Sequence, residues 1–230
     1  MIAALRAWRR GWQHLNHRGY LYIWANVLWV LLSLPLITAP AAWAGLNRLS
    51  YALHRSPGAT LDEFWMGFRE NLKRGAVLAL VNIVVVVVNA TNLVTYRGAS
   101  GGLTDLIKGV WLVTLVVWFG TQFFVWALFY QMEQPSLVGA FRNTAAFILL
   151  NPVFTLVSWV LVVVVVAISV LLFPAVMLLT GSALAAIATT LVIDRIQAAG
   201  YSGGIPPEVE GAGEDGYPSL DAEVESGCPP

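Results

Sequence analysis

Three asparagines in one apolar segment are the residues whose type and spacing best suit chemistry in a hydrophobic environment. Asn82, Asn89 and Asn92 lie between Gly75 and Tyr96, in a stretch without a charged residue. Asn82 and Asn89 are seven residues apart and share a helix face, and Asn92 lies close to that face. Such amides can form a polar path or a site for a neutral ligand. They can also bond neighbouring helices, at about 0.6 kcal/mol per contact, which is the simpler interpretation.

Groups for acid–base, nucleophilic or metal chemistry are scarce. The central regions of the apolar segments contain no Asp, Glu, Lys, Arg or His, whereas ion pumps and proton-coupled carriers usually hold such groups there. His14 and His17 are three residues apart, but no carboxylate in that segment completes a metal site. The single cysteine, Cys228, excludes an internal disulfide and a cysteine-based metal site. We therefore expect no enzyme activity, no cofactor and no metal.

The composition indicates that lipid surrounds most of the chain. It is 58% apolar and 11% charged, against about 45–50% and about 25% in soluble domains. An uncharged run of about 20 residues has the length of a helix that crosses a hydrocarbon core of ~30 Å. The sequence therefore predicts an all-α fold, a polytopic transmembrane helical bundle with interfacial amphipathic helices. Its expected partner is the lipid bilayer, and we expect no nucleic acid.

The hydrophobic periods divide the chain into a membrane domain, residues 1–197, and a tail. The predicted segments of the domain are an interfacial helix (2–17), a broken hairpin (20–55), an amphipathic helix (61–74), four spans (about 75–96, 108–130, 153–172 and 175–193) and a short amphipathic helix before the third span. The tail, 198–230, is rich in Gly, Pro and acidic residues, and its composition predicts disorder on the cytoplasmic side.

A break within the first apolar segment is predicted from its prolines. Pro35 and Pro40 are five residues apart, and each removes a backbone donor from the helix. A break at membrane depth requires other groups to bond the freed carbonyls, and the hydroxyl of Thr38 can do part of this.

The distribution of basic residues selects between two topologies. If residues 20–38 cross the membrane fully, six Lys and Arg lie on one side and seven on the other. If residues 20–55 instead return to the side where they began, eleven lie on one side and only Arg97 and Lys108 on the other. The second count favours the returning hairpin, with both termini cytoplasmic.

The amphipathic helix at 61–74 is the predicted docking surface. Thr60 and Glu63 have the spacing of a capping box, and the apolar and basic residues that follow can contact the bilayer surface or another protein. The residues assigned to this docking role are Phe64, Phe68, Arg69 and Asn71.

Two motifs carry a resemblance to a known family. The element from Leu34 to Pro40, Pro-x-x-Thr-x-Pro in outline, is followed by Phe-x-x-x-Phe-Arg-x-Asn from Phe64 to Asn71. With these motifs, residues 4–197 resemble the YesL-like family of bacterial integral membrane proteins of unknown function. The resemblance implies an accessory role near carbohydrate uptake systems, with a sugar transporter as a possible partner, and it carries over no catalytic residue.

Two functional hypotheses follow from these observations. The first, by resemblance, is a non-enzymatic accessory or assembly partner of a membrane system such as carbohydrate uptake. The alternative is a passive carrier or channel for a neutral solute, which would use the face of Asn82, Asn89 and Asn92.

Overall fold

The computed structural model describes residues 2–17, 19–56, 58–99, 101–172 and 179–200, except for the side chains of 2, 3 and 14–17. Within these ranges there is no strand, which confirms the all-α prediction. The helices are α1 (Ile2–His17), α2 (Gly19–Ser33), α3 (Ala39–Arg55), α4 (Asp62–Glu70), α5 (Leu72–Thr95), α6 (Gly102–Phe129), α7 (Leu137–Leu150), α8 (Pro152–Leu171) and α10 (Gly181–Ala198). The side chains of His14 and His17, the start of the predicted fourth span and nearly all of the tail lie outside the described residues.

Three helices are long and apolar enough to cross a membrane: α5, α6 and α8. Most of their Val and Leu side chains point outward, for example Val84 (60% exposed) and Val163 (66% exposed). Soluble monomers rarely leave such contiguous apolar surface uncovered, and large exposed patches mark sites of contact with membranes or other proteins. The chain is therefore a membrane protein, and lipid is the medium that fits these surfaces.

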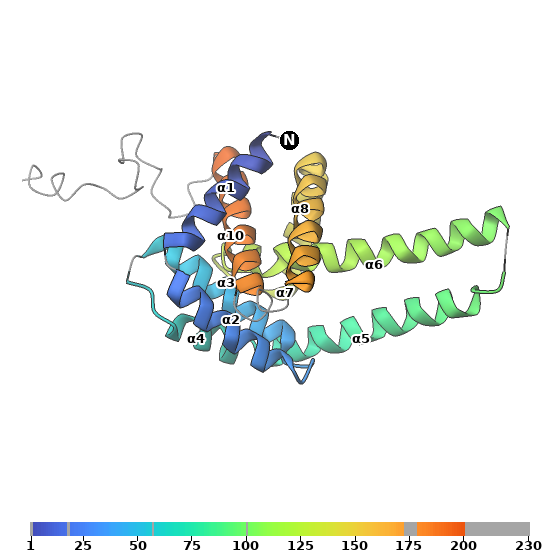
Figure 1. Cartoon of the computed structure of the whole chain (residues 1–230), viewed down its shortest axis with the longest axis horizontal. Helices are drawn as coiled ribbons and strands as arrows, with labels where there is room; N and C mark the ends of the chain where they lie inside the picture. Colours follow the sequence, from blue (N-terminus) through green and yellow to red (C-terminus); the bar gives the residue numbers. More distant parts are fainter. Residues whose placement is uncertain (1, 18, 57, 100, 173–178, 201–230) are drawn as a thin grey trace, which may run out of the picture.

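The candidate spans do not run in one direction. In Figure 1, α5 and α6 leave the other helices side by side and project as a long hairpin, while α8 and α10 run across that direction. The sequence predicted that all spans cross one bilayer together. If α5 and α6 cross the bilayer in this arrangement, α8 lies along the membrane plane instead of crossing it.

The helix α10 forms the centre of the bundle. It packs against α1, α2, α3 and α6, and nearly all of its residues from Gly181 to Ile193 are buried. Many of these residues are Ala, Gly, Ser or Thr, which let neighbouring helices approach closely. The described part of the predicted fourth span is thus protein core rather than a lipid-facing surface.

The broken hairpin is present as α2 and α3, which pack against each other. The hydroxyl of Thr38 donates to the carbonyl of Leu32, as the sequence predicted, and Pro40 lies in the first turn of α3, where its missing N–H costs nothing. The fifteen residues of α2 span only ~22 Å at 1.5 Å per residue. This is less than the hydrocarbon core of ~30 Å, and the turn that follows α2 exposes Leu34 and Leu36.

Polar contacts attach this hairpin to α10. The side-chain oxygen of Asn26 accepts from the backbone N–H of Ser182 at 2.9 Å, which satisfies one of the unpaired donors at the start of α10. The Ser182 hydroxyl donates to the carbonyl of Tyr22 at 2.6 Å. All three residues are buried, so the hydrogen bonds fix where α2 lies along α10.

The helix α1 presents two different faces. Ala4, Ala7 and Gly11 are buried, and a Cβ at Gly11 would lie 3.1 Å from the backbone of Ile187 in α10. Leu5 and Trp12 are about half exposed, whereas Trp8 packs against the core. The small residues and Trp8 therefore anchor α1 to the bundle, and Leu5 and Trp12 face outward, where an interfacial helix contacts lipid.

Candidate functional site

The three asparagines of α5 do not form one polar row. Asn82 joins α5 to α6: its side-chain oxygen accepts from Trp118 at 2.9 Å and from Gln122 at 2.7 Å. Its amide nitrogen donates back to the oxygen of Gln122 at 3.1 Å. The amides of Asn89 and Asn92 instead donate to carbonyls of their own helix, those of Val85 and Val88. Of the three asparagines, Asn82 makes the interhelical bonds of the simpler interpretation, whereas Asn89 and Asn92 bond within α5, which the sequence did not predict.

Replacing Asn82 with Leu should destabilise the α5–α6 pair, because it leaves the Trp118 and Gln122 donors without this acceptor. We expect a loss of about 1–2 kcal/mol, near the upper end for such bonds in membranes. Asn92→Leu, which removes only a bond within its own helix, should change the free energy of unfolding by only a few tenths of a kcal/mol. Thermal unfolding of both variants in detergent checks this, and equal melting temperatures would contradict it.

The expected docking residues of α4 are mostly part of the protein core, which corrects the sequence-based assignment. Phe64, Phe68 and Asn71 are all less than 10% exposed, and Phe64 and Phe68 pack in clusters with residues of α3. Of the four residues only Arg69 lies on the surface. The amphipathic period identified the correct apolar face, but this face covers α3 rather than lipid or a partner.

The predicted capping box at the start of α4 does not form. The Thr60 hydroxyl donates to the carboxylate of Asp62 at 3.0 Å, and α4 has no side-chain hydrogen bond at its N-cap. Glu63 accepts from the Nε of Arg48 at 2.9 Å instead. The Glu63 carboxylate therefore pairs with Arg48 of α3 and does not cap the start of α4.

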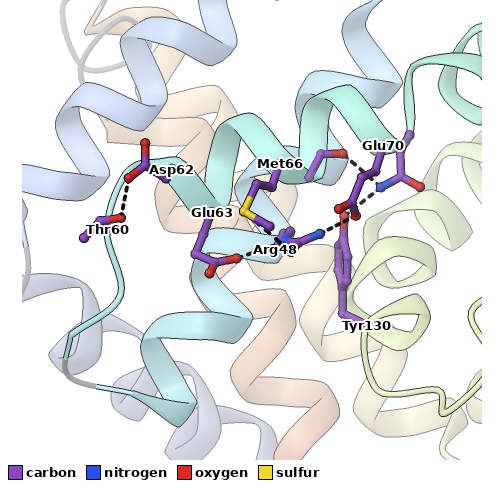
Figure 2. A network of polar contacts seen from close by, with 9 residues as sticks. Arg48, Thr60, Asp62, Glu63, Met66, Glu70 and Tyr130 are labelled. Carbon is purple, nitrogen blue, oxygen red and sulfur yellow. Dashed lines mark hydrogen bonds and ion pairs between the residues drawn. The ribbon is translucent and has the colours of Figure 1, made fainter.

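Arg48 is the centre of a polar network between α3 and α4, which Figure 2 shows. Its guanidinium forms ion pairs with Glu63 and Glu70, and one of its nitrogens lies 4.0 Å from the sulfur of Met66. Burial opposes the charged form, but the two carboxylates favour it more strongly, and the net effect raises the pKa of Arg48. The arginine is therefore charged at every physiological pH and holds α4 on α3.

A second set of hydrogen bonds extends from the end of α4 to α5 and α6. The amide of Asn71 donates to the carbonyl of Gly67 at 2.9 Å and to the Tyr130 hydroxyl at 3.0 Å. Arg74 donates to the oxygen of Asn71 at 3.1 Å and lies over the ring of Phe129. Burial raises the pKa of Tyr130, so it is a neutral hydroxyl. These bonds fix the base of the α5–α6 hairpin.

A cleft of about 950 Å³ opens next to this network, and we call it the basal cleft. It is lined by the C-terminal ends of α3 and α10, by the segment after α6 and by α7. The lining residues are Tyr51, Arg55, Leu128, Tyr130, Gln131, Met132, Glu133, Asn143, Ala146, Phe147, Leu150, Asn151, Arg195, Ile196 and Ala199.

Sequence reasoning did not identify the basal cleft, because its residues come from four distant segments. The signal available was the placement of Arg55 and Arg195 in the last turns of two helices, where a cation is favoured by the helix dipole. The rings of Tyr51 and Tyr130 stack at 6.3 Å, and Arg55 lies 4.8 Å above Tyr51. Cationic and aromatic side chains thus lie together along the basal cleft.

His54 is a structural residue in the described part of the chain. Its Nδ1 lies 2.7 Å from the carbonyl of Ser50, and its Nε2 lies 3.0 Å from the hydroxyl of Thr190 in α10. Burial lowers the pKa of His54, so the imidazole is neutral at pH 7. No group of three or more potential metal ligands occurs among the described residues.

Comparison with known proteins gives one family match. No curated protein and no solved structure matches the chain. A family model described as "Protein of unknown function, DUF624" matches residues 22–93. This range holds α3, α4 and most of α2 and α5, and therefore the proline break and the Arg48 network. Over these residues the chain is similar to a family of proteins of unknown function, and the similarity assigns no reaction.

Proposed function

We propose that this membrane protein is a non-enzymatic accessory or assembly partner of another membrane protein. The observation that carries the proposal is that ion pairs and hydrogen bonds join α3, α4 and the base of the α5–α6 hairpin into one polar network, while the amides within the spans bond to the protein itself. Arg48 joins the middle of α3 to both ends of α4, and Asn71 and Tyr130 join the end of α4 to the end of α6. A rigid polar network suits docking better than it suits transport of a solute.

The exposed face of α4 is the docking surface that fits this role. Trp65 is 37% exposed and Met66 is 44% exposed, and Asp62 and Arg69 flank them on the surface. Trp, Met and Arg are enriched where proteins bind one another. The ion pairs of Arg48 hold α4 in place before a partner arrives, which lowers the entropic cost of binding.

The resemblance to the YesL-like family suggests a transporter for carbohydrate as the partner. A bacterial inner membrane, with both termini and the α4 face in the cytoplasm, completes the proposal. The basic residues support this orientation, because among the described Lys and Arg only Arg97 and Lys108 lie near the tip of the α5–α6 hairpin.

Site-specific crosslinking tests the proposal. A photoreactive amino acid at position 65, on the α4 face, should crosslink a membrane protein that also copurifies in a fixed ratio in mild detergent. The same amino acid at position 99, at the tip of the hairpin, should not yield that product. Trp65→Ala combined with Arg69→Glu should abolish copurification. Recovery of the protein alone at every detergent strength would overturn the accessory function.

The alternative function, a passive carrier for a neutral solute, has less support. A carrier would need amides open to a hydrated path, but the Asn82 side chain bonds to α6 through both of its polar atoms. Reconstitution into liposomes with a panel of neutral solutes decides between the two functions. We expect unchanged permeability, and solute flux that Asn82→Leu abolishes would favour the carrier.

A further inference from the structure

The basal cleft lies at the ends of two apolar helices. The candidate span α6 ends at Phe129, just before the lining residue Tyr130, and α8 begins at Pro152, just after the lining residue Asn151. If α6 crosses the bilayer, a phospholipid in the adjacent leaflet has its headgroup at this end of the helix.

The lining of the basal cleft is divided into a polar part and an apolar part. The polar part includes Arg55, which is exposed, and Arg195, whose side chain is 23% exposed. The apolar part is on α7, where Leu150 is 80% exposed and the neighbouring Leu149 is 79% exposed. A cationic recess beside an uncovered apolar ridge matches a ligand with an anionic head and a hydrocarbon tail.

Charges near the cleft leave it favourable for an anion. Arg195 donates to Asp194 at 2.9 Å, and Asp194 also pairs with Arg10, so two arginines share one carboxylate. Among the described residues that line the cleft, Glu133 is the only acid. The C-terminal ends of α3 and α10 carry partial negative charge that disfavours an anion, and Arg55 and Arg195 in their last turns offset this charge. Eleven of the thirteen basic residues are expected on this side of the membrane.

The lining also offers hydrogen-bond donors beyond the two arginines. The side chains of Asn143 and Gln131 line the cleft, and the Nε2 of Gln131 is buried without a hydrogen-bond partner. Such an unsatisfied donor costs about 1–3 kcal/mol. A small rotation of the side chain would let it donate to an oxygen of a bound headgroup.

We propose that the basal cleft binds an anionic phospholipid, with the phosphate at Arg55 and Arg195 and an acyl chain along Leu149 and Leu150. The ligand class follows from the pairing of cations with an exposed apolar ridge. This site is separate from the α4 docking face, and its test uses the purified protein alone, so it can succeed or fail independently of the accessory function.

Native mass spectrometry of the purified full-length protein tests the site. The protein is delipidated in mild detergent and offered equal amounts of phosphatidylglycerol and phosphatidylcholine. We expect bound phosphatidylglycerol to exceed bound phosphatidylcholine about tenfold, since each arginine near a lipid surface contributes to anion preference. Arg55→Gln combined with Arg195→Gln should bring the ratio close to one. The matched control, Arg97→Gln with Lys108→Gln at the hairpin tip, should keep the preference.

Three further measurements identify the ligand and control for misfolding. Arg55→Gln alone leaves the contacts of Arg195 with Asp194 and Phe154 in place and should still lower the ratio severalfold. Leu150→Gln should weaken binding of both lipids and keep their ratio. Glycerol phosphate, which has the head without acyl chains, should not compete at equal concentration. Equal lipid binding by the unaltered protein, or full competition by glycerol phosphate, would overturn the proposal.

Discussion

Gly75→Leu should be the most damaging substitution in the α5–α6 hairpin. A Cβ at Gly75 would lie 2.7 Å from the backbone nitrogen of Ala41 and 2.9 Å from its Cα. The clash is with backbone at the start of α3, which cannot move aside as a flexible side chain can. Overpacking costs about 1–3 kcal/mol and sometimes more, and we expect a value at or above the top of this range. The variant should show a lower melting temperature and a smaller monodisperse peak in detergent.

Gly109→Leu is the matched control for this prediction. It lies in α6, and a Cβ there meets no atom within 4 Å. Both substitutions replace glycine within an apolar helix, so both gain the same helix propensity, about 1 kcal/mol at most. Only the variant at position 75 loses the close contact with α3. If both variants unfold at the same temperature, the contact of α5 with Ala41 is not what holds the hairpin to the bundle.

Arg48→Met should produce the second large effect, because it removes the cation that pairs with Glu63 and Glu70. The side chains of Arg48 and Glu63 are 20% and 32% exposed, and that of Glu70 is 55% exposed. Breaking a fully buried pair costs about 3–5 kcal/mol, and solvent screening reduces this. We therefore expect a loss of about 2 kcal/mol, measured as a lower melting temperature with easier proteolysis of α4.

Neutralising the partners should restore much of that stability. In the triple variant Arg48→Met, Glu63→Gln, Glu70→Gln, no carboxylate is left without its cation, so most of the loss should be recovered. The double variant Glu63→Gln, Glu70→Gln is the control for the amides themselves. A triple variant as unstable as Arg48→Met alone would show that packing of the Arg48 side chain, rather than its charge, holds α4.

Local patterns predicted the helices and the proline break because each depends on nearby residues. Two prolines and Thr38 are sufficient to predict where the hairpin breaks and which group bonds a freed carbonyl. Uncharged length alone predicted α5, α6 and α8 as candidate spans. These features can be predicted without knowing which helices pack against each other.

Packing partners were not predictable in the same way. The period of α4 places Phe64 and Phe68 on one face, but the same period describes a helix on lipid and a helix on α3. In α10, apolar length suggested a lipid-facing span, whereas its small residues signal contact with other helices. The basal cleft and the angle between α5 and α8 depend on the whole arrangement of helices, which no single segment specifies.

Cysteine labelling of intact cells tests the central claim, that the broken hairpin returns to the basic side of the membrane while the α5–α6 hairpin crosses it. Ser56→Cys, after α3, and Gly98→Cys, at the tip of the α5–α6 hairpin, are both exposed positions, placed in a Cys228→Ser background. A membrane-impermeant maleimide should label Gly98→Cys in intact cells and label Ser56→Cys only after permeabilisation. Labelling of Ser56→Cys in intact cells as strong as that of Gly98→Cys would show that residues 20–55 cross the membrane, and would contradict the account.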